Sequence, residues 1–256
     1  MGSDTPRITG LIPARYASTR FPGKALAPLR GKPMIQHTYE RSRRARCLTD
    51  LYVVTDDRRI ADAVRGFGGE PIMTAPDHPS GTDRLAAAVQ EMDTDVVVNI
   101  QGDEPLITPE AIETVVQPLV DDPDLPMTTL AHRITTTEDL LNPHMGKVVF
   151  DGRGLALYFS RSPLPWPGER PDRAFLREHR FYNTVGLYGY RRSFLLTFAG
   201  LEPTPLERIE RLEQLRALEN GYRITVRQTD YAPLGVDVPE DLVKAERRLA
   251  AEEDAS

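Results

Sequence analysis

Cysteine is almost missing from this chain of 256 residues, which contains Cys47 alone. One thiol can form neither an internal disulfide nor a cysteine-based zinc cluster, so the usual staples of small secreted domains are excluded. Long apolar runs are missing too. No run reaches the roughly 18 residues of a membrane span, and residues 1–9 lack the apolar centre of a signal peptide. These absences predict a soluble protein of the reducing cytoplasm, with no membrane as a partner.

An excess of positive charge is missing as well. The chain has 38 Asp and Glu residues against 32 Lys and Arg, a formal net charge of −6. No basic footprint therefore recommends a nucleic acid as a partner. Only four of the 32 cations are lysines: Lys24, Lys32, Lys147 and Lys244. In a chain that uses arginine by default, each lysine is more informative than usual.

What the sequence does contain is an alternation of short apolar runs and helical patterns. Hydrophobic residues make up 40% and charged residues 27%, as in an ordinary globular protein. Strands are expected at 8–13, 51–55, 71–74 and 96–100, and helices at 34–46, 58–67, 82–92 and 109–120. Apolar strands that alternate with helices predict an α/β fold with a parallel sheet covered on both faces. Ligands of such sheets bind at the carboxyl ends of the strands.

The second half of the chain is less regular. We expect a hairpin from 147–150 and 155–159, a strand at 185–190, a surface loop at 163–173, and helices at 205–219 and 239–251. No internal repeat and no clean linker is present. We therefore predict one domain over 1–256. Its core would comprise about 8–130 and 200–250, and an antiparallel insertion would comprise about 131–199.

A basic loop follows the first expected strand. Arg15, Arg20 and Lys24 lie there among hydroxyl side chains and a glycine. Backbone amides and Arg forks in such a loop can wrap a polyphosphate, although a solvated basic loop is the plain alternative. A Walker A loop is excluded, because Gly31-Lys32 is followed by Pro33 where a hydroxyl is needed.

An acidic loop follows the strand at 96–100. Gly102 lets the backbone approach a neighbour closely, and Asp103 and Glu104 come next. Asp237, before the last helix, offers another carboxylate. One or two carboxylates with substrate phosphate oxygens suit Mg²⁺. The alternatives are that Asp103 or Glu104 caps the next helix or turn, and that Asp237 caps the last one.

Six segments, taken in order, resemble the 3-deoxy-manno-octulosonate (Kdo) cytidylyltransferases over nearly the whole chain. The segments are Pro13-Ala-Arg-Tyr-Ala-Ser-Thr-Arg-Phe-Pro-Gly-Lys24, Ser80-Gly-Thr-Asp-Arg-Leu85, Gln101-Gly-Asp-Glu-Pro105, Tyr158-Phe-Ser-Arg161, Leu212-Glu-Gln-Leu-Arg216 and Gly235-Val-Asp-Val-Pro-Glu-Asp-Leu242. The resemblance implies a doubly wound, mainly parallel sheet of the nucleotide-sugar transferase type with a smaller antiparallel insertion. It also implies a homodimer that converts CTP and a 3-deoxy sugar acid into the CMP-sugar and pyrophosphate.

The resemblance assigns roles to individual residues. Arg15, Lys24, Asp103 and Asp237 would be catalytic, and the two aspartates would bind Mg²⁺. The nucleotide would be bound by Ala14, Arg15, Ser18, Thr19, Arg20, Lys24, Ser80, Gly81, Thr82 and Arg84. The acceptor would be bound by Gln101, Arg161, Tyr188, Glu213 and Gln214.

The chain departs from the family pattern at the acceptor end. Asn183-Thr184 stand where the family has Arg-His, and Met145-Gly146 stand where it has Ala-Val before Lys147. Losing a charge-assisted hydrogen bond costs roughly 1.5–3 kcal/mol, enough to shift the preference among sugar acids. Two alternatives to a Kdo enzyme therefore stay open, namely a CMP-transferase for another ulosonic or acidic acceptor and a catalytically silent nucleotide-binding homologue.

Overall fold

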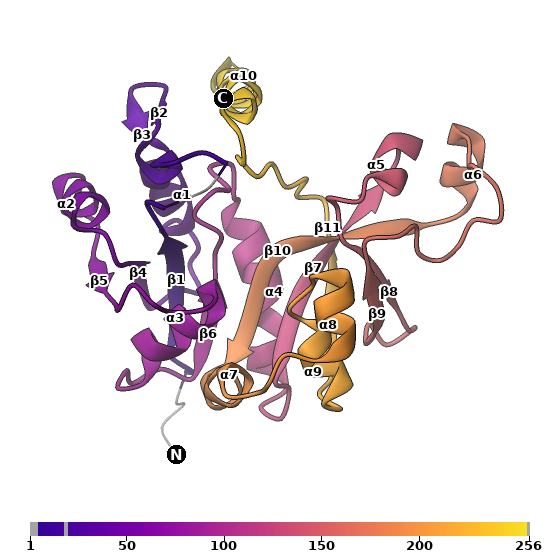
Figure 1. The fold of residues 1–256 in the computed structure, drawn as a ribbon, viewed down its shortest axis with the longest axis horizontal. Helices are drawn as coiled ribbons and strands as arrows, with labels where there is room; N and C mark the ends of the chain where they lie inside the picture. The colour runs from indigo at the N-terminus through magenta and orange to yellow at the C-terminus, as the bar shows by residue number, and fades with distance from the viewer. Residues whose placement is uncertain (1–4, 18–19, 255–256) are drawn as a thin grey trace. The chain divides into compact units, whose positions relative to one another are not determined.

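The computed structural model describes residues 5–17 and 20–254, and these form two compact units. Unit 1 is Met1–Glu113 with Pro233–Ser256, and unit 2 is Thr114–Ala232. Both units combine strands with helices (Figure 1), so the predicted α/β class is confirmed. None of the helices in the described part of the chain is long and apolar enough to cross a membrane.

Unit 1 is built on a parallel sheet of four strands in the order β6-β1-β4-β5. Its strands are β1 (Ile8–Ala14), β4 (Asp50–Thr55), β5 (Pro71–Met73) and β6 (Val96–Asn99), with a small hairpin of β2 (Pro28–Leu29) and β3 (Lys32–Pro33). Its helices are η1 (Lys24–Leu26), α1 (Met34–Ser42), α2 (Arg58–Gly66), α3 (Gly81–Val89) and α10 (Pro239–Asp254), and α4 (Pro109–Asp121) crosses into unit 2. Each strand and helix expected before residue 121 is present, within a few residues of its expected bounds.

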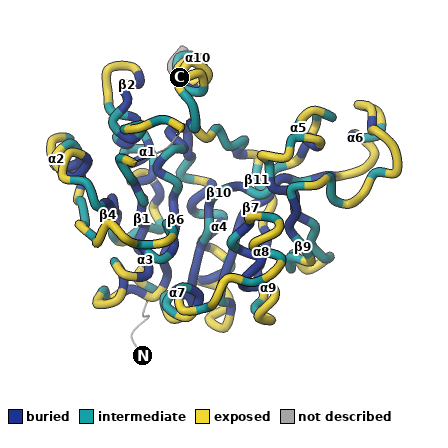
Figure 2. Tube along the Cα trace, viewed as in Figure 1, coloured by how far each residue is buried: buried dark blue, intermediate teal, exposed yellow. Residues whose placement is uncertain are grey.

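Local chemistry explains where the helices of unit 1 begin. Asp57 caps α2 by accepting a hydrogen bond from the Arg59 amide, and Ser80 and Asp83 form a reciprocal capping box at α3. Thr108 accepts a hydrogen bond from the amide of Ala111 at the start of α4. Strands β1, β4 and β6 are buried along most of their length, whereas the edge strand β5 is not (Figure 2). The carboxyl ends of β1, β4 and β6 therefore carry the loops that are free to bind ligands.

Helix α10 packs on the rest of unit 1 through its apolar side. Leu249 and Ala245 join a buried cluster with Leu29, Met34 and Val236, among others. The last helix is thereby fixed to the elements that surround the end of β1.

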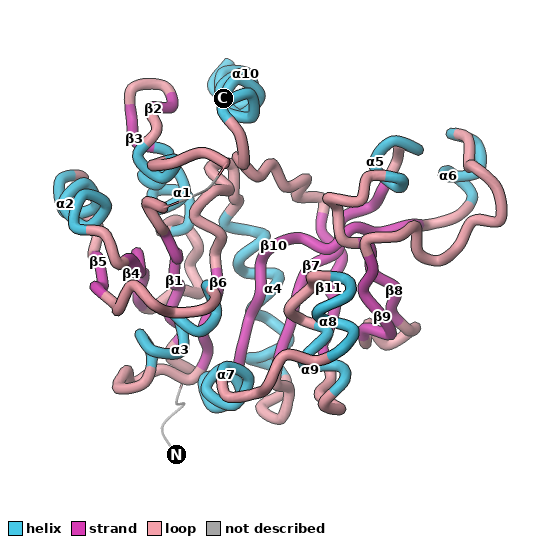
Figure 3. The backbone as a smooth tube through the Cα atoms, viewed as in Figure 1, coloured by secondary structure: helices cyan, strands magenta, loops and turns pink. Residues whose placement is uncertain are grey.

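Unit 2 has a mixed sheet. Strand β11 (Ile224–Thr229) pairs in parallel with β7 (Met127–Ile134), and β10 (Phe181–Arg191) is antiparallel to β7. Strand β8 (Lys147–Phe150) is antiparallel to β10 and to β9 (Ala156–Ser160). The helices are α5 (Thr137–Leu141), α6 (Arg173–Glu178), α7 (Arg192–Ala199), α8 (Pro205–Glu210) and α9 (Leu215–Glu219). The hairpin of β8 and β9 is present as expected, and the stretch before α6 is a loop (Figure 3).

The expectation of one helix over 205–219 was wrong. Helix α8 ends at Glu210, Arg211 adopts a left-handed conformation with φ of 54°, and α9 starts only at Leu215. The Arg161 side chain supplies the reason, because its Nε donates to the carbonyl of Glu210 and its Nη2 to that of Arg211. Carbonyls at a helix end need such partners once the helix stops. The break is therefore stabilised by a side chain some 50 residues away, which the leucine periodicity could not indicate.

Candidate nucleotide and acceptor sites

The basic loop after β1 folds back on itself. The amide of Gly23 donates to the carbonyl of Tyr16 over 2.8 Å, and Gly23 has a φ of +72°. A Cβ at this glycine would lie 3.1 Å from the Tyr16 ring, so the close approach requires glycine. The guanidinium of Arg59 stacks 3.3 Å from the centre of the same ring. The turn returns the chain to the end of β1 and places Lys24 there, whereas Ser18 and Thr19 lie outside the described residues.

The acidic loop reaches the same place from β6. A Cβ on Gly102 would lie 2.7 Å from the carbonyl oxygen of Pro13, so only glycine lets this loop pass so near the end of β1. Glu104 closes a turn with its amide on the carbonyl of Gln101. The close approach that Gly102 predicts is confirmed, and it brings Asp103 beside the basic loop.

Lys24 joins two carboxylates that are 134 residues apart in the sequence. Its Nζ lies 2.5 Å from Oδ2 of Asp103 and 3.3 Å from Oδ1 of Asp237, and it donates to the carbonyl of Val236 over 3.1 Å. The amide of Val236 in turn donates to the carbonyl of Asp103 over 2.9 Å. Arg20 adds an ion pair of 2.9 Å to Asp237. Two cations of the basic loop thus converge on a pair of carboxylates that come from two other loops.

Neither Asp103 nor Asp237 is needed as a helix cap. Thr108 caps α4, and the amides of Asp237 and Val238 before α10 donate to Asp241. Asp103 and Asp237 are therefore not needed as caps and face cations instead. The side chains of Lys24 and Asp103 are only 17% and 28% exposed, which makes their pairing stronger than that of a surface salt bridge.

The carboxylate pair fits a divalent cation. Both carboxylates reach one point, which the Lys24 ammonium now marks, and Mg²⁺ prefers one or two carboxylates completed by phosphate oxygens and water. Within residues 5–17 and 20–254, no group of three or more His, Cys, Asp or Glu side chains could hold a metal. Asp103 and Asp237 would therefore need oxygen atoms from a substrate or from water to complete a coordination shell.

Arg15 and Ser80 connect the basic loop to the start of α3. The Nη2 atom of Arg15 donates to the carbonyls of His78 and Ser80 over 2.8 and 2.9 Å. The Ser80 hydroxyl is engaged with Asp83 in the capping box, Gly81 begins the helix, and Thr82 is buried. Ala14 is the buried last residue of β1. The loop at 78–82 is thus held against the end of β1 by Arg15.

Arg84 is fully buried in unit 1, unlike the cations of the basic loop, of which Arg15 and Lys24 are half-buried and Arg20 is exposed. It pairs with Asp56 at 3.2 Å and donates to the Thr74 hydroxyl over 2.7 Å. Its Nε has no hydrogen-bond partner in the described structure. Sequence reasoning missed Asp56, although its place directly after β4, at the carboxyl edge of the sheet, could have revealed it.

Most of the predicted acceptor residues lie in unit 2, and Arg161 is tied to the backbone there. Besides its two bonds at the α8 break, its Nη1 donates to the carbonyls of Pro143 and His144. Glu210 holds the same corner through the Ser160 hydroxyl at 2.7 Å and the Arg161 amide at 2.8 Å. Sequence reasoning missed Glu210, which looked like a residue on the solvent side of a longer helix. These bonds set the course of the chain into Glu213 and Gln214.

The remaining predicted acceptor residues lie in different places. Tyr188 is on β10, and its ring centre lies 6.2 Å from that of Tyr190. Oε1 of Glu213 lies 3.7 Å from Nη2 of Arg216. Gln101 belongs to unit 1, at the carboxyl end of β6, and its Nε2 donates to Asn99 over 3.3 Å.

The two departures from the family pattern are in contact. The amide of Thr184 donates to the carbonyl of Gly146 over 2.8 Å. A Cβ on Gly146 would lie 3.0 Å from Cγ2 of Thr184 and 3.5 Å from Leu212. Nearby in the chain, Asn183 Oδ1 and Gln214 Nε2 are buried without a partner in the described structure. This corner of unit 2 therefore holds a shared packing space and two unsatisfied polar atoms.

Lys147, beside this corner, is a fully buried cation. Its Nζ donates to the carbonyls of Asn142 and Met145 over 2.7 and 2.8 Å. Burial, followed by repulsion from Arg161, lowers the pKa of Lys147 to about 8, against the attraction of Glu210. The ammonium thus holds the loop before β8 closed at some cost in stability.

Comparisons with known proteins point to one family. The family model described as Cytidylyltransferase matches residues 9–224. The 3-deoxy-manno-octulosonate cytidylyltransferase of Syntrophotalea carbinolica is 56% identical over 245 residues, which cover 94% of this chain and 98% of that protein. The enzyme of the same name from Geotalea uraniireducens is 55% identical over 249 residues, 95% of this chain and 99% of that protein.

Solved structures give the same result. The structure of CMP:2-keto-3-deoxy-manno-octonic acid synthetase complexed with CTP superposes with a TM-score of 0.89 at 43% identity, covering 96% of this chain and 99% of that one. A putative glucose-1-phosphate thymidylyltransferase from Bacillus anthracis, at 16% identity and a TM-score of 0.64 over 94% of each chain, shares the fold alone. On its matched motifs, its fold and its relatives, this chain belongs to the family of 3-deoxy-manno-octulosonate cytidylyltransferases.

Proposed function

We propose that this protein transfers CMP from CTP to Kdo and releases pyrophosphate. The anomeric hydroxyl of the sugar acid would attack the α-phosphorus in line with the leaving pyrophosphate. The observation that carries the proposal is the cluster of Lys24, Asp103 and Asp237, in which cations and carboxylates from distant loops meet at the carboxyl edge of the unit 1 sheet. Phosphoryl transfer needs positioning and charge neutralisation above all, and this cluster supplies both.

The cations of the basic loop would bind the triphosphate. Arg20 is 61% exposed on its side chain, so it can turn from Asp237 toward phosphate oxygens at little cost. Lys24 would exchange carboxylate oxygens for phosphate oxygens over a short distance. Arg15 would act by fixing the loop at Ser80, next to which we place the nucleoside. Arg84, being buried, would support that loop from below through Asp56.

Asp103 and Asp237 would hold Mg²⁺ together with the substrate. The ion, when bound, supplies positive charge that polarises the phosphate and the attacking hydroxyl. The two aspartates contribute by keeping a fixed separation, which the bond between Val236 and the carbonyl of Asp103 maintains. Both belong to unit 1, so the proposed metal site needs no residue of unit 2.

The acceptor would be bound by Gln101, Tyr188, Glu213 and Gln214, with Arg161 fixing the backbone that leads to the last two. A second candidate acceptor, an ulosonic acid related to Kdo, is favoured by the corner at Gly146 and Thr184. Small neutral side chains there stand where the family has bulkier ones, and the buried Gln214 amide nitrogen has no hydrogen-bond partner in the described structure.

The experiment that tests the proposal is pyrophosphate release with CTP and Mg²⁺, measured with Kdo, with an 8-amino analogue of Kdo, with a nonulosonate, and with no acceptor. Release with Kdo at ordinary enzyme rates is the expected result. Release with another acid alone would establish the second candidate, and CTP binding with no release for any acid would indicate a silent homologue. If Thr184 explains a changed preference, Thr184→His should raise kcat/KM for Kdo.

We further propose, from the family resemblance, that the enzyme acts as a homodimer in the cytoplasm. Sedimentation equilibrium of the full chain tests the assembly. A mass near 28.7 kDa, that of one chain, would exclude the dimer.

A further inference from the structure

The cluster of Lys24, Asp103 and Asp237 is closed around the lysine ammonium. Nζ has three acceptors, namely Oδ2 of Asp103 at 2.5 Å, Oδ1 of Asp237 at 3.3 Å and the carbonyl oxygen of Val236 at 3.1 Å. An ammonium carries three hydrogens, so the number of acceptors matches the number of donors. The Lys24 side chain is also only 17% exposed. The ammonium is therefore a satisfied part of the cluster, unlike a loose surface cation.

The ammonium lies where a divalent cation would bind. Mg²⁺ prefers oxygen ligands, and the three acceptors of Lys24 are all oxygen atoms, two of them from carboxylates. A lysine charge and a divalent cation would repel each other strongly if both used the same oxygens. Binding of the one therefore requires the departure of the other.

The charges of the cluster cancel before any substrate is bound. Asp103 and Asp237 carry two negative charges. Lys24 and Arg20 carry two positive charges, and Arg20 lies 2.9 Å from Asp237. These four side chains leave no surplus of negative charge that would attract a divalent cation. A triphosphate changes this balance, because it offers several anionic oxygens to the same two cations.

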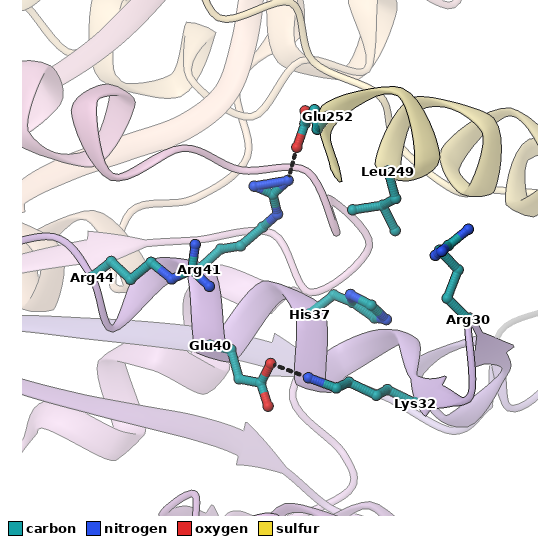
Figure 4. Close-up of a pocket in the computed structure, with 8 residues that line it drawn as sticks. All are labelled: Arg30, Lys32, His37, Glu40, Arg41, Arg44, Leu249 and Glu252. Carbon is teal, nitrogen blue, oxygen red and sulfur yellow. Dashed lines mark hydrogen bonds and ion pairs between the residues drawn. The ribbon is translucent and has the colours of Figure 1, made fainter. Parts of the chain in front are cut away.

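The carboxylates are fixed more firmly than the ammonium. The amide of Val236 donates to the carbonyl of Asp103 over 2.9 Å, which joins their two loops. Helix α10 begins two residues after Asp237, and the ion pair of Arg41 with Glu252 joins this helix to α1 (Figure 4). The ammonium stands at the end of a flexible four-carbon stem. It is therefore the group that can leave the cluster when a stronger partner arrives.

We infer that Lys24 blocks the metal site until a nucleotide draws its ammonium away, so that the protein binds the divalent cation together with the nucleotide or after it. Lys24 thereby has a second role, which rests on the proposed function because the nucleotide and the cation are those of that reaction. With CTP bound, Lys24 contacts phosphate oxygens. Without CTP, it occupies the oxygens of Asp103 and Asp237 that the cation needs.

Binding of Mn²⁺ to the full chain without nucleotide tests this role. Mn²⁺ uses the same oxygen ligands as Mg²⁺, and electron paramagnetic resonance measures the free ion. Lys24→Met should bind Mn²⁺ about ten- to a hundredfold more tightly than the parent, because no charge-assisted hydrogen bonds have to be displaced. Arg20→Gln should gain only about two- to threefold, since Arg20 is 61% exposed. Equal affinities of the parent and Lys24→Met would overturn the proposal.

The matched control is Lys32→Met, which removes a lysine elsewhere in unit 1. Lys32 pairs with Glu40 at 2.7 Å in a cavity whose described lining residues include none of the cluster (Figure 4). Its loss should leave the affinity for Mn²⁺ unchanged. Lys24→Met/Asp103→Asn should lose the gain of Lys24→Met, which would locate the ion at the cluster. An equal gain in Lys32→Met, or a gain that survives Asp103→Asn, would overturn the proposal.

Two further variants of the experiment complete the test. Lys24→Gln, which keeps a hydrogen-bond donor for Asp103, should show a smaller gain and replaces Lys24→Met if that variant does not fold. CTP without an acceptor should tighten Mn²⁺ binding by a larger factor in the parent than in Lys24→Met. Water-proton relaxation measures this, because it distinguishes Mn²⁺ on the protein from Mn²⁺ on free CTP. Equal factors would contradict the blocking role.

Failure of this proposal and failure of the proposed function give different results. A gain in Lys24→Met without nucleotide, combined with no pyrophosphate release for any acid, would support the blocking role and overturn the proposed function. Pyrophosphate release with Kdo, combined with equal Mn²⁺ affinities of the parent and Lys24→Met, would have the opposite meaning.

Discussion

The two units differ in the partners and in the solvent exposure of their polar side chains. In unit 1, Lys24, Asp103 and Asp237 form mutual ion pairs at the mouth of a sheet, and every one of these side chains is reachable by solvent. In unit 2, Lys147 is fully buried against backbone carbonyls, and Gln214 buries an amide nitrogen that has no partner in the described structure.

This difference separates two kinds of site. Charges that face each other at a solvent edge can exchange partners at little cost, as a site for a polyphosphate requires. Buried polar atoms tolerate no such exchange, because each loses about 1–3 kcal/mol when it is left without a hydrogen bond. Under the proposed function, unit 1 would exchange ionic partners with the nucleotide, and unit 2 would select the acceptor by shape and hydrogen bonding. Single substitutions in each unit test this contrast.

Removing the charge of Asp237 should have the largest effect. Asp237→Asn should lower the rate of pyrophosphate release by roughly a thousandfold or more, because it removes a carboxylate that organises transition-state charge. Steady-state assays with CTP, Mg²⁺ and Kdo measure this, and circular dichroism should show an unchanged fold. The matched control is Asp62→Asn on the exposed side of α2, which should be as active as the parent. Near-normal turnover of Asp237→Asn would remove this residue from the site.

Burial of Lys147 should appear as a pH dependence of stability. Its pKa is about 8 in the folded protein against an ordinary 10.5, so between these values the folded protein binds fewer protons than the unfolded chain. The free energy of unfolding of the parent should therefore rise with pH across this window, by about 3 kcal/mol relative to Lys147→Met. Urea unfolding at a series of pH values measures the difference. Lys244→Met, at an exposed lysine, is the control, and parallel curves for the parent and Lys147→Met would contradict the assignment.

The corner at Gly146 should resist a larger side chain. Gly146→Val should lower the free energy of unfolding by about 1–3 kcal/mol, because its Cβ meets Thr184 at 3.0 Å and Leu212 at 3.5 Å. Gly152→Val is the matched control, since nothing lies within 4 Å of a Cβ there. Adding Thr184→Ala should recover part of the loss, and a double-mutant cycle measures that coupling. Additive effects would mean that the two positions do not share space.

The smallest effect concerns the single thiol, in unit 1. Burial, and then the charge of Glu113, raise the pKa of Cys47 to about 11. At pH 8 only about a thousandth of the thiol is ionised, so reaction with a disulfide reagent should be slow. Glu113→Gln should speed it a few-fold by lowering that pKa, whereas Glu91→Gln, in the exposed turn after α3, should not. An unchanged rate in Glu113→Gln would leave burial as the whole cause.

The contrast also explains what the sequence could predict. The helices and parallel strands of unit 1, and the meeting of the loops that carry Lys24 and Asp103, follow from contiguous patterns whose strands end at one edge. Strands β7 and β11 carry Thr, His, Arg and Gln among their apolar residues, so no period marks them in the sequence. Their burial comes from pairing with each other and with β10.

The acceptor corner was hidden for a related reason. Gly146 and Thr184 are 38 residues apart, and neither reveals in the sequence that it occupies space the other would need. The break between α8 and α9 depends on Arg161, and the burial of Arg84 depends on Asp56. Contacts of this kind are set by tertiary structure, and local propensity does not encode them.

Lys24 has one further consequence for the resting protein. Two aspartates held so close together would repel each other, but the ammonium that lies between them serves as a built-in counter-ion. The carboxylates of Asp103 and Asp237 can therefore lie close together without a counter-ion from solution. In the proposed reaction the same positive charge passes from one set of oxygens to the next, so little water has to rearrange when the substrate arrives. The Lys24 ammonium thus keeps Asp103 and Asp237 in place until the substrate arrives.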